Sequence, residues 1–445
     1  MARLSPFRGC RFNIEKVGDL AAVVSPPYDV IPDDLRRELH RRHPFNVVRL
    51  ILGQDRAGDD EAENRYLRAR RYFEEWERAG VLLRESKPGF YVYQQEYLWA
   101  HGERRVRTGL IGAVGLEAYN AGIIFPHEQT FPGPKADRLR LMRALPVNLE
   151  QIFCFYPGPA EPIRGRLLDA TRMSPEYDFG DGAGVRHRLW ILDDAEGIAG
   201  LVAAFGDRPL FIADGHHRYE TALTFQQEMR RIDAPGEPDK AYNFVMMTLV
   251  SIEDEGLTVL PTHRLVQAAG TGGSTEILGL LRSHFQCEER DMQGGRGIEK
   301  VFEEMGDRGK EGHVFGLYTG GDKFHLLTLK DPAIPAGLGE PDRPVERLDV
   351  VVLESLVFRK LLRLEDTVTI RYTPDARVAL EEVQRGRAAA AFFLNPTPVP
   401  RITEIVSTGE RLPPKSTYFH PKLVSGLVFL KVDPGERLTV QQEVS

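Results

Sequence analysis

The segment Asp214-Gly215-His216-His217-Arg218 gathers four ionisable side chains around one glycine. It lies between an apolar run, 210–213, and an amphipathic stretch, 219–230, which predicts a strand, a tight turn and a helix. The first N–H groups of such a helix attract a phosphate, and Arg218 with the histidines would add charged donors. Asp214 would hold Mg²⁺ or orient a histidine. The open alternative is an Asp N-cap with the histidines packed on the sheet.

A second group of residues combines a candidate base with cationic side chains. In chain order it contains His127, Glu128, Thr130, Lys135, Asp137 and Arg138. A Glu beside a His can abstract a proton, and a Lys and an Arg can neutralise a phosphate. The start resembles His-Glu-x-x-His, but Phe131 occupies the second His position, which excludes a zincin. An N-capped helix with surface ion pairs is the alternative.

The segment from Gly409 to Ser416 has the spacing of a P-loop except that Pro414 replaces the second glycine. Proline lacks the N–H group that a phosphate cradle uses, so the segment is not a Walker A nest. Lys415, Ser416 and Thr417 can still contact a phosphate from a turn, or they can bond the local backbone.

Two shorter segments offer substrate-binding candidates. Tyr28 and Asp29 follow the rigid turn Ser25-Pro26-Pro27, which can present them to a ligand. His263 and Arg264 form a basic corner after a strand. Both segments are also consistent with a purely structural role.

Several elements must position these residues. Apolar residues at helical spacing predict a helix over 61–79, and alternating aromatic and β-branched residues predict paired strands over 90–97 and 106–116. Runs at 21–24 and 46–52 are expected to be extended. The predicted fold class is α/β (mixed α+β), with an N-terminal mixed α/β region at 1–105, a phosphate-binding core at 106–262 and a C-terminal mixed α/β region at 275–445.

The composition restricts the partners and the compartment. The chain has 445 residues, 42% of them apolar, and its 58 basic and 65 acidic residues give a net charge of −7. This charge repels nucleic acid and anionic membranes, so neither is expected as a partner. The three cysteines are scattered, which favours a reducing compartment, and we expect a cytoplasmic protein without a signal peptide or membrane span.

Several segments together resemble the bacterial family called domain of unknown function 1015. The resemblance spans almost the whole chain, and its longest motif is highly specific. It rests on Ser25-Pro26-Pro27-Tyr28-Asp29-Val30-Ile31, His43-Pro44-x-Asn46-x-Val48-Arg49-Leu50, His127-Glu128, Pro134-Lys135-x-Asp137-Arg138-Leu139, the run from Phe211 to Ala222, Pro261-Thr262-His263-Arg264 and Pro413-Pro414-Lys415-Ser416-Thr417-Tyr418-Phe419.

That family is similar to the ParB/sulfiredoxin superfamily, whose phosphate loop lies at a strand-to-helix turn. The resemblance therefore implies a ParB/sulfiredoxin-like nucleotide- or phosphate-binding core over 106–262, with additional mixed α/β regions. His216 stands where sulfiredoxin has its nucleophilic cysteine, so thiol chemistry is not available. The Asp-Gly-His-His-Arg form is instead similar to the free-serine kinases of the superfamily.

The resemblance implies a small-molecule kinase that converts free L-serine to O-phospho-L-serine, with pyrophosphate, ADP or ATP as donor and Mg²⁺ as cofactor. A phosphoserine phosphatase of serine biosynthesis and a ParB-like nucleotide-binding regulator are the alternatives. The catalytic candidates are Glu128, Asp214, His216 and His217. Glu128 is favoured as the base because the superfamily's catalytic glutamate also precedes the phosphate loop. The sequence defines neither the donor, the direction of the reaction nor the oligomeric state.

Overall fold

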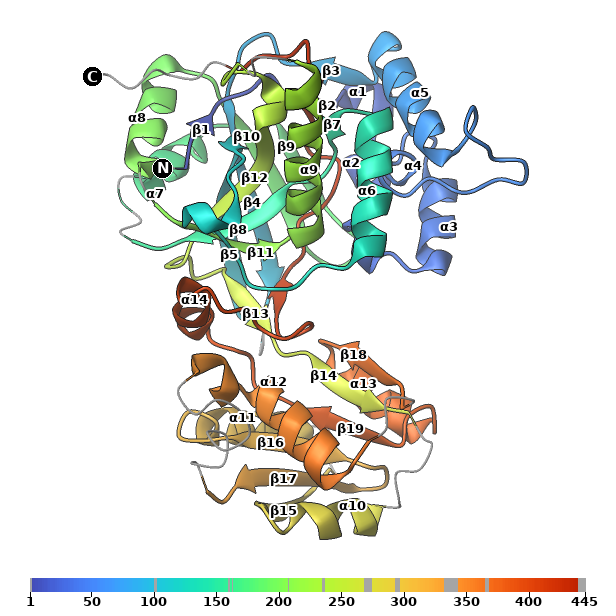
Figure 1. The fold of residues 1–445 in the computed structure, drawn as a ribbon, viewed down its shortest axis with the longest axis vertical. Helices are drawn as coiled ribbons and strands as arrows, with labels where there is room; N and C mark the ends of the chain where they lie inside the picture. The colour runs from blue at the N-terminus through green and yellow to red at the C-terminus, as the bar shows by residue number, and fades with distance from the viewer. Residues whose placement is uncertain are drawn as a thin grey trace. The chain divides into compact units, whose positions relative to one another are not determined.

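The computed structural model describes residues 2–99, 102–158, 161, 163–206, 208–233, 237–267, 274–292, 297–331, 343–364 and 368–438. The chain divides into two units. The first consists of Met1–Pro126, Thr130–Thr258 and Pro421–Ser445, and the second of His127–Gln129 and Val259–His420. Figure 1 shows the elements of each unit.

The first unit is built on a nine-stranded mixed sheet in the order β6-β11-β8-β12-β5-β4-β10-β9, with β1 beside β5. Strand β11 is parallel to β6, and β12 is parallel to β8, whereas the other pairs are antiparallel. The strands are β1 (Leu4–Ser5), β4 (Phe90–Leu98), β5 (Arg104–Gly115), β6 (Ile124–Pro126), β8 (Ile152–Tyr156), β9 (Tyr177–Gly180), β10 (Arg186–Leu192), β11 (Leu210–Asp214) and β12 (Phe244–Ser251).

Helices and two small sheets complete the first unit. Helix α6 packs against α5 and α9, and α9 contacts β8 and β12. The helices are α1 (Ile14–Val17), α2 (Leu20–Val23), α3 (Asp33–Arg42), α4 (Val48–Ile51), α5 (Arg65–Arg78), α6 (Pro132–Ala144), α7 (Ile163–Ala170), α8 (Ala195–Phe205) and α9 (His216–Ile232), with short 3-10 turns η1 (Tyr28–Val30), η3 (Tyr119–Ala121) and η4 (Ala241–Asn243). The small sheets pair β2 (Cys10–Phe12) with β3 (Leu82–Arg84) and β7 (Val147–Asn148) with β21 (Leu430–Lys431).

The second unit contains a six-stranded antiparallel sheet in the order β15-β17-β16-β19-β14-β18. Its strands are β14 (His263–Val266), β15 (Phe285–Asp291), β16 (Val314–Tyr318), β17 (Lys323–Leu329), β18 (Ile370–Thr373) and β19 (Ala390–Phe393). Strand β13 (Thr258–Leu260) pairs with β20 (Tyr418–His420). The helices are α10 (Ser274–Leu281), α11 (Gly297–Arg308), α12 (Asp349–Val352), α13 (Ala376–Gln384) and α14 (Val399–Ser407), with η6 (Pro344–Arg347) and the π-helical η7 (Leu353–Leu361).

The structure confirms the mixed α/β class and the elements around the longest motif. Strand β11 and helix α9 form the predicted strand, turn and helix, and β4 and β5 form the predicted pair of strands, which is antiparallel. Helix α5 is the predicted helix, but it begins later and ends one residue earlier than expected. The ParB/sulfiredoxin-like assignment of the core stays a prediction. In the part of the chain that the structure describes, no helix has both the length and the apolar character needed to cross a membrane.

The two units differ from the three predicted regions. Strand β5 crosses residue 105, and it pairs with strands from both sides of that position. The last part of the chain, from Pro421 onward, belongs to the first unit rather than to the C-terminal region. The two units are defined by pairing between strands that are far apart in the sequence. Composition does not reveal such pairing.

The prediction of extended structure at 21–24 and 46–52 is wrong, because both runs contain helical turns, α2 and α4. Asp19 caps α2 by accepting a hydrogen bond from Ala21 N. Asn46, which is fully buried, accepts one from Val48 N at 2.9 Å. These side-chain hydrogen bonds to the backbone outweigh the strand preference of the β-branched residues beside them.

Asn46 also joins the two turns, since its Nδ2 donates to the carbonyl oxygens of Ala22 and Val24 at 2.8 and 3.1 Å. We expect Asn46→Ala to lower the free energy of unfolding by about 2–3 kcal/mol, because buried backbone groups lose their partners. Asp19→Ala, which removes the exposed cap of α2, is the control and should cost only about 1 kcal/mol. Urea denaturation of both variants measures the difference, and equal losses would contradict the bridging role.

Candidate functional site

The turn between β11 and α9 leads into a 17-residue helix. Gly215 is the N-cap residue and has φ +99°, a left-handed conformation that a side chain disfavours. A Cβ at this position would lie 3.1 Å from the guanidinium carbon of Arg218. The alternative of an Asp N-cap is therefore wrong, and the turn requires glycine for both its backbone and its neighbour.

Asp214, the last residue of β11, binds two cations. Its Oδ1 lies 2.5 Å from Lys422 Nζ, and its Oδ2 accepts a hydrogen bond from Arg218 at 2.7 Å. Burial alone would raise the pKa of this carboxyl, but the charges of Lys422 and Arg218 outweigh it and hold the pKa well below its ordinary value. Asp214 is therefore an anion that fixes two cations beside the start of α9.

Lys422 is brought to this site by a buried polar network. Gln95 Nε2 donates to the Lys422 carbonyl oxygen at 2.9 Å, and Arg107 donates to the carbonyl oxygen of Pro421 at 2.5 Å and to Gln95 Oε1. Arg107 is almost completely buried, which lowers its pKa to about 10. Sequence reasoning missed Lys422 because it lies 208 positions from Asp214 and outside any chemical motif.

The guanidinium of Arg218 is mostly buried and anchored to the backbone. Its side chain is 12% exposed, and its NH1 donates to the carbonyl oxygen of Gln151 at 2.5 Å. Burial would lower its pKa, but the charges of Glu150 and Asp214 raise it. Arg218 is thus a charged, anchored group, and its position within one turn of Gly215 keeps it at the helix start.

The two histidines face different surroundings. His216 is buried at the first position of α9, and its charge contributes to lowering the pKa of Asp214. His217 Nε2 accepts a hydrogen bond from Phe131 N at 2.9 Å, and the two rings stack. In this arrangement neutral His217 carries its proton on Nδ1.

Tyr28, Arg138 and Glu150 form a second cluster of the first unit. Tyr28 N donates to Glu150 Oε1 at 3.0 Å, and the Arg138 guanidinium lies 4.1 Å from the centre of the Tyr28 ring. Burial raises the pKa of Tyr28. Arg138 is 7% exposed and donates to the Ile51 carbonyl oxygen. Asp29 is exposed, and its negative charge raises the pKa of Arg218. This second cluster therefore interacts electrostatically with the cluster around Asp214.

Lys135 and Thr130 converge on one carboxylate of α9. Glu220 Oε2 accepts hydrogen bonds from Thr130 Oγ1 at 2.6 Å and from Lys135 Nζ at 2.8 Å. The negative charge of Glu220 offsets the positive charge of Lys135. This pairing makes Lys135 a weaker candidate for a phosphate ligand.

The remaining candidates belong to the second unit. His127 Nε2 lies 2.9 Å from Thr417 Oγ1, and 4.0 Å separates it from Glu128 Oε1. Ser416 Oγ donates to the Pro413 carbonyl oxygen at 2.6 Å, the local backbone contact that the sequence left open, and Lys415 has φ +61°. The structure thus brings His127 and Thr417 together across a long stretch of chain.

His263 and Arg264 have structural contacts. His263 Nδ1 accepts from Leu394 N at 3.3 Å, and burial with the charge of Arg264 lowers its pKa to about 4. Arg264 donates to the Thr262 carbonyl oxygen and lies over the Tyr372 ring. Both side chains are buried in the second unit, and their role in substrate binding stays a prediction.

Asp214 does not fit the predicted role of metal ligand, because each of its oxygens pairs with a cation. The described residues also contain no group of three or more His, Cys, Asp or Glu side chains that could hold a metal ion. We therefore derive no step through a resident Mg²⁺.

Lys422→Met tests the ion cluster through its pH dependence. At pH 7 we expect a loss of about 3 kcal/mol in unfolding free energy, because a buried carboxylate loses one partner. A pKa lowered by folding gives stability that is complete above the unfolded value near ~4 and is lost as the pH falls toward the folded value. The difference between variant and wild type should therefore shrink below about pH 4 in denaturation measured across pH. Lys431→Met is the control, since Lys431 pairs with the more exposed Glu77, and a difference that is constant with pH would contradict the pairing.

Gly215→Ala tests the turn. Gly122 also has a left-handed φ of +67°, but a Cβ there would meet open space. Gly122→Ala should cost about 1–2 kcal/mol from backbone strain alone, and Gly215→Ala more, because Arg218 must also move. Thermal denaturation of both variants gives the comparison, and equal costs would show that the turn tolerates a displaced Arg218.

Comparison with solved structures gives similarities of low score. The chain is 13% identical to a free serine kinase in complex with AMP, covering 66% of this chain and 83% of that one, with a TM-score of 0.32. It is 14% identical to a conserved hypothetical protein from Pyrococcus furiosus, covering 67% and 88% with a TM-score of 0.31. It is 10% identical to SbnI with a C-terminal truncation from Staphylococcus aureus, covering 75% and 90% with a TM-score of 0.33. We draw no conclusion about activity from similarities at these scores.

No curated protein matches the chain. A family model described as "Protein of unknown function (DUF1015)" matches residues 4–351, which is more than half of the chain and includes the β11–α9 turn. The chain therefore belongs to the DUF1015 family, as its motifs indicated.

Proposed function

We propose that the chain is a phosphotransferase that binds a phosphoanhydride donor, pyrophosphate, ADP or ATP, at the β11–α9 turn and phosphorylates free L-serine. The observation that carries the proposal is the cationic site at the start of α9, where Arg218 and Lys422 flank Asp214. A helix N-terminus with two fixed cations favours a compact polyanion. The resemblance of the motifs to the free-serine kinases supports the acceptor.

The residues of this site supply charge and position. The low pKa of Asp214 keeps it ionised at neutral pH, so Arg218 and Lys422 stay charged and in place before a donor binds. Their charges then act on the phosphoryl oxygens as negative charge shifts toward the leaving phosphate. Gly215 lets the backbone approach the donor closely.

The transfer itself needs a base for the acceptor. The serine hydroxyl oxygen forms a bond to the terminal phosphorus, the bond from that phosphorus to the leaving phosphate oxygen breaks, and the hydroxyl proton passes to the base. With water in place of serine, the same groups would hydrolyse the donor. The alternative phosphoserine phosphatase would instead direct water at the phosphorus of O-phosphoserine.

A phosphorus NMR assay with L-serine and each donor tests the proposal. We expect one donor signal to fall as an O-phosphoserine signal rises in equal amount. Hydrolysis of added O-phosphoserine without any transfer would favour the phosphatase, whereas loss of a donor signal without phosphoserine would contradict transfer to serine. Consumption of none of the three donors would remove the proposal.

Glu128 stays the predicted base, and kinetics test it. Glu128→Gln should lower kcat by roughly 10²- to 10⁴-fold with donor binding nearly preserved, because only the proton acceptor is lost. Asp214→Asn should instead weaken donor binding, since Arg218 and Lys422 lose the charge that fixes them. Near-normal turnover of Glu128→Gln, with Asp214→Asn inactive but binding donor normally, would transfer the role to Asp214.

A further inference from the structure

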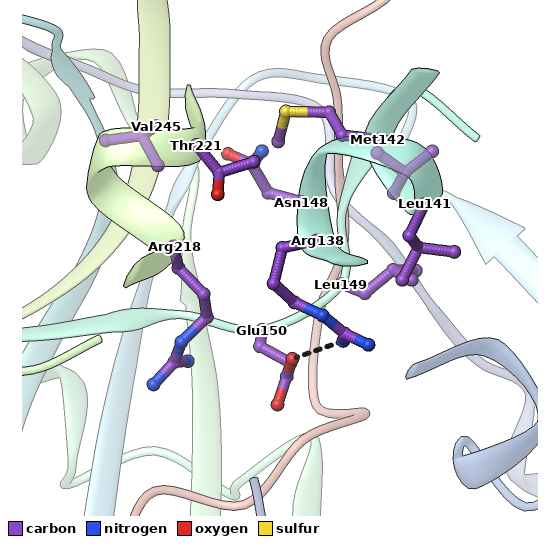
Figure 2. Close-up of a pocket in the computed structure, with 10 residues that line it drawn as sticks. Arg138, Leu141, Met142, Asn148, Leu149, Glu150, Arg218, Thr221 and Val245 are labelled. Carbon is purple, nitrogen blue, oxygen red and sulfur yellow. Dashed lines mark ion pairs between the residues drawn. The ribbon is translucent and has the colours of Figure 1, made fainter. Parts of the chain in front are cut away.

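A small cavity lies between α6 and α9 in the first unit, and it shares only Arg218 with the phosphate site described above. Its volume is about 50 Å³. Aliphatic side chains such as Leu141, Leu149 and Val245 form part of its wall. The polar lining residues are Arg138, Asn148, Glu150, Arg218 and Thr221. Figure 2 shows Arg218 and Thr221 reaching in from one side, Arg138 from the other, and Glu150 between the two arginines.

Two donors in this wall have no partner in the part of the chain that the structure describes. They are Arg218 Nε and Thr221 Oγ1, both buried, and the Thr221 residue is only 2% exposed. Three positions apart on α9, the two residues share one face of the helix. A buried donor without an acceptor is costly, so the pair is suited to a ligand with acceptor oxygens.

Glu150 supplies the opposite charge. Its Oε1 accepts hydrogen bonds from Tyr28 N at 3.0 Å and from Ser425 Oγ at 3.1 Å. Its Oε2 lies 3.8 Å from Arg138 NH1, too far for a hydrogen bond. One carboxylate oxygen thus keeps the capacity to accept from a ligand cation.

The size and the charge of the cavity restrict the ligand. One water-sized group needs roughly 10–15 Å³ on this scale, so the cavity holds about three to five non-hydrogen atoms. The α-carbon, amino nitrogen and carboxylate of an amino acid are five such atoms. A zwitterion also matches a wall that has donors on α9 and a carboxylate beside them, whereas a phosphate would face Glu150 with like charge.

We propose that this cavity binds the α-carboxylate and α-ammonium groups of a free amino acid. The carboxylate oxygens accept hydrogen bonds from Arg218 Nε and Thr221 Oγ1, the ammonium group donates to Glu150 Oε2, and the side chain of the amino acid lies outside the cavity. That the bound amino acid is serine rests on the proposed function, whereas binding of a free amino acid does not.

Calorimetric titration of the full chain without donor tests the proposal. L-Serine and L-alanine, which share the α-groups, should both bind, whereas ethanolamine and 3-hydroxypropionate, which each lack one group, should not. Thr221→Val should weaken amino acid binding roughly 10- to 100-fold, because a hydrogen bond to a charged group is lost. The variant should fold at least as stably as the wild type, since it removes an unpartnered buried hydroxyl.

Thr248→Val is the matched control. Thr248, on β12, is also buried, and its Oγ1 likewise has no partner among the described residues, but it does not line the cavity. This variant should bind L-alanine as the wild type does. Glu150→Gln, which keeps the acceptor for Tyr28 N but removes the negative charge, should weaken binding of both amino acids.

These binding measurements test the amino acid site independently of phosphate transfer. Unchanged amino acid binding in folded Thr221→Val, competition of inorganic phosphate with L-alanine, or no binding of either amino acid by the wild type would overturn the inference, even if phosphoserine forms. Amino acid binding that Thr221→Val abolishes would support it, even if no donor transfers phosphate, in which case only the proposed function falls.

Discussion

The first unit depends on the ionised carboxylate of Asp214. It is the only anion among the contacts described at the β11–α9 turn that binds both Arg218 and Lys422, and it joins the end of a strand, the start of a helix and the returning C-terminal chain. A charge in this position is stable only because two cations balance its desolvation. The same balance keeps those cations fixed, so the constraint that stabilises the turn also prepares it for an anion.

Support for this ion cluster comes from side chains far from it in sequence. Arg107 and Gln95, on neighbouring strands β5 and β4, hold the backbone of Pro421 and Lys422. Arg107 remains buried because its donors meet carbonyl and amide oxygens and its guanidinium lies 4.6 Å from the centre of the Phe153 ring. The C-terminal segment is therefore part of the site's framework, and the sheet fixes where its lysine lies.

The anion site and the α6–α9 cavity share Arg218. One edge of its guanidinium binds Asp214 and the Gln151 carbonyl oxygen, and its Nε has no partner in the described chain. A planar group with several donors can serve two ligands at once, which a lysine cannot do in the same geometry. This sharing offers a physical link between the proposed binding of a donor and that of an amino acid.

The sequence by itself determined the mixed α/β class, the strand and helix around Gly215 and the family, because these depend on local periodicity and on a contiguous motif. It also located Asp214 and Arg218, but not their environment. Asn46 and Asp19 turned expected strands into helical turns through local hydrogen bonds from side chain to backbone. Glu220 paired with Lys135 over 85 positions. Only the tertiary structure decided which cations remain available and that Lys422 joins the site, since charge pairing depends on distances in space that spacing along a chain does not encode.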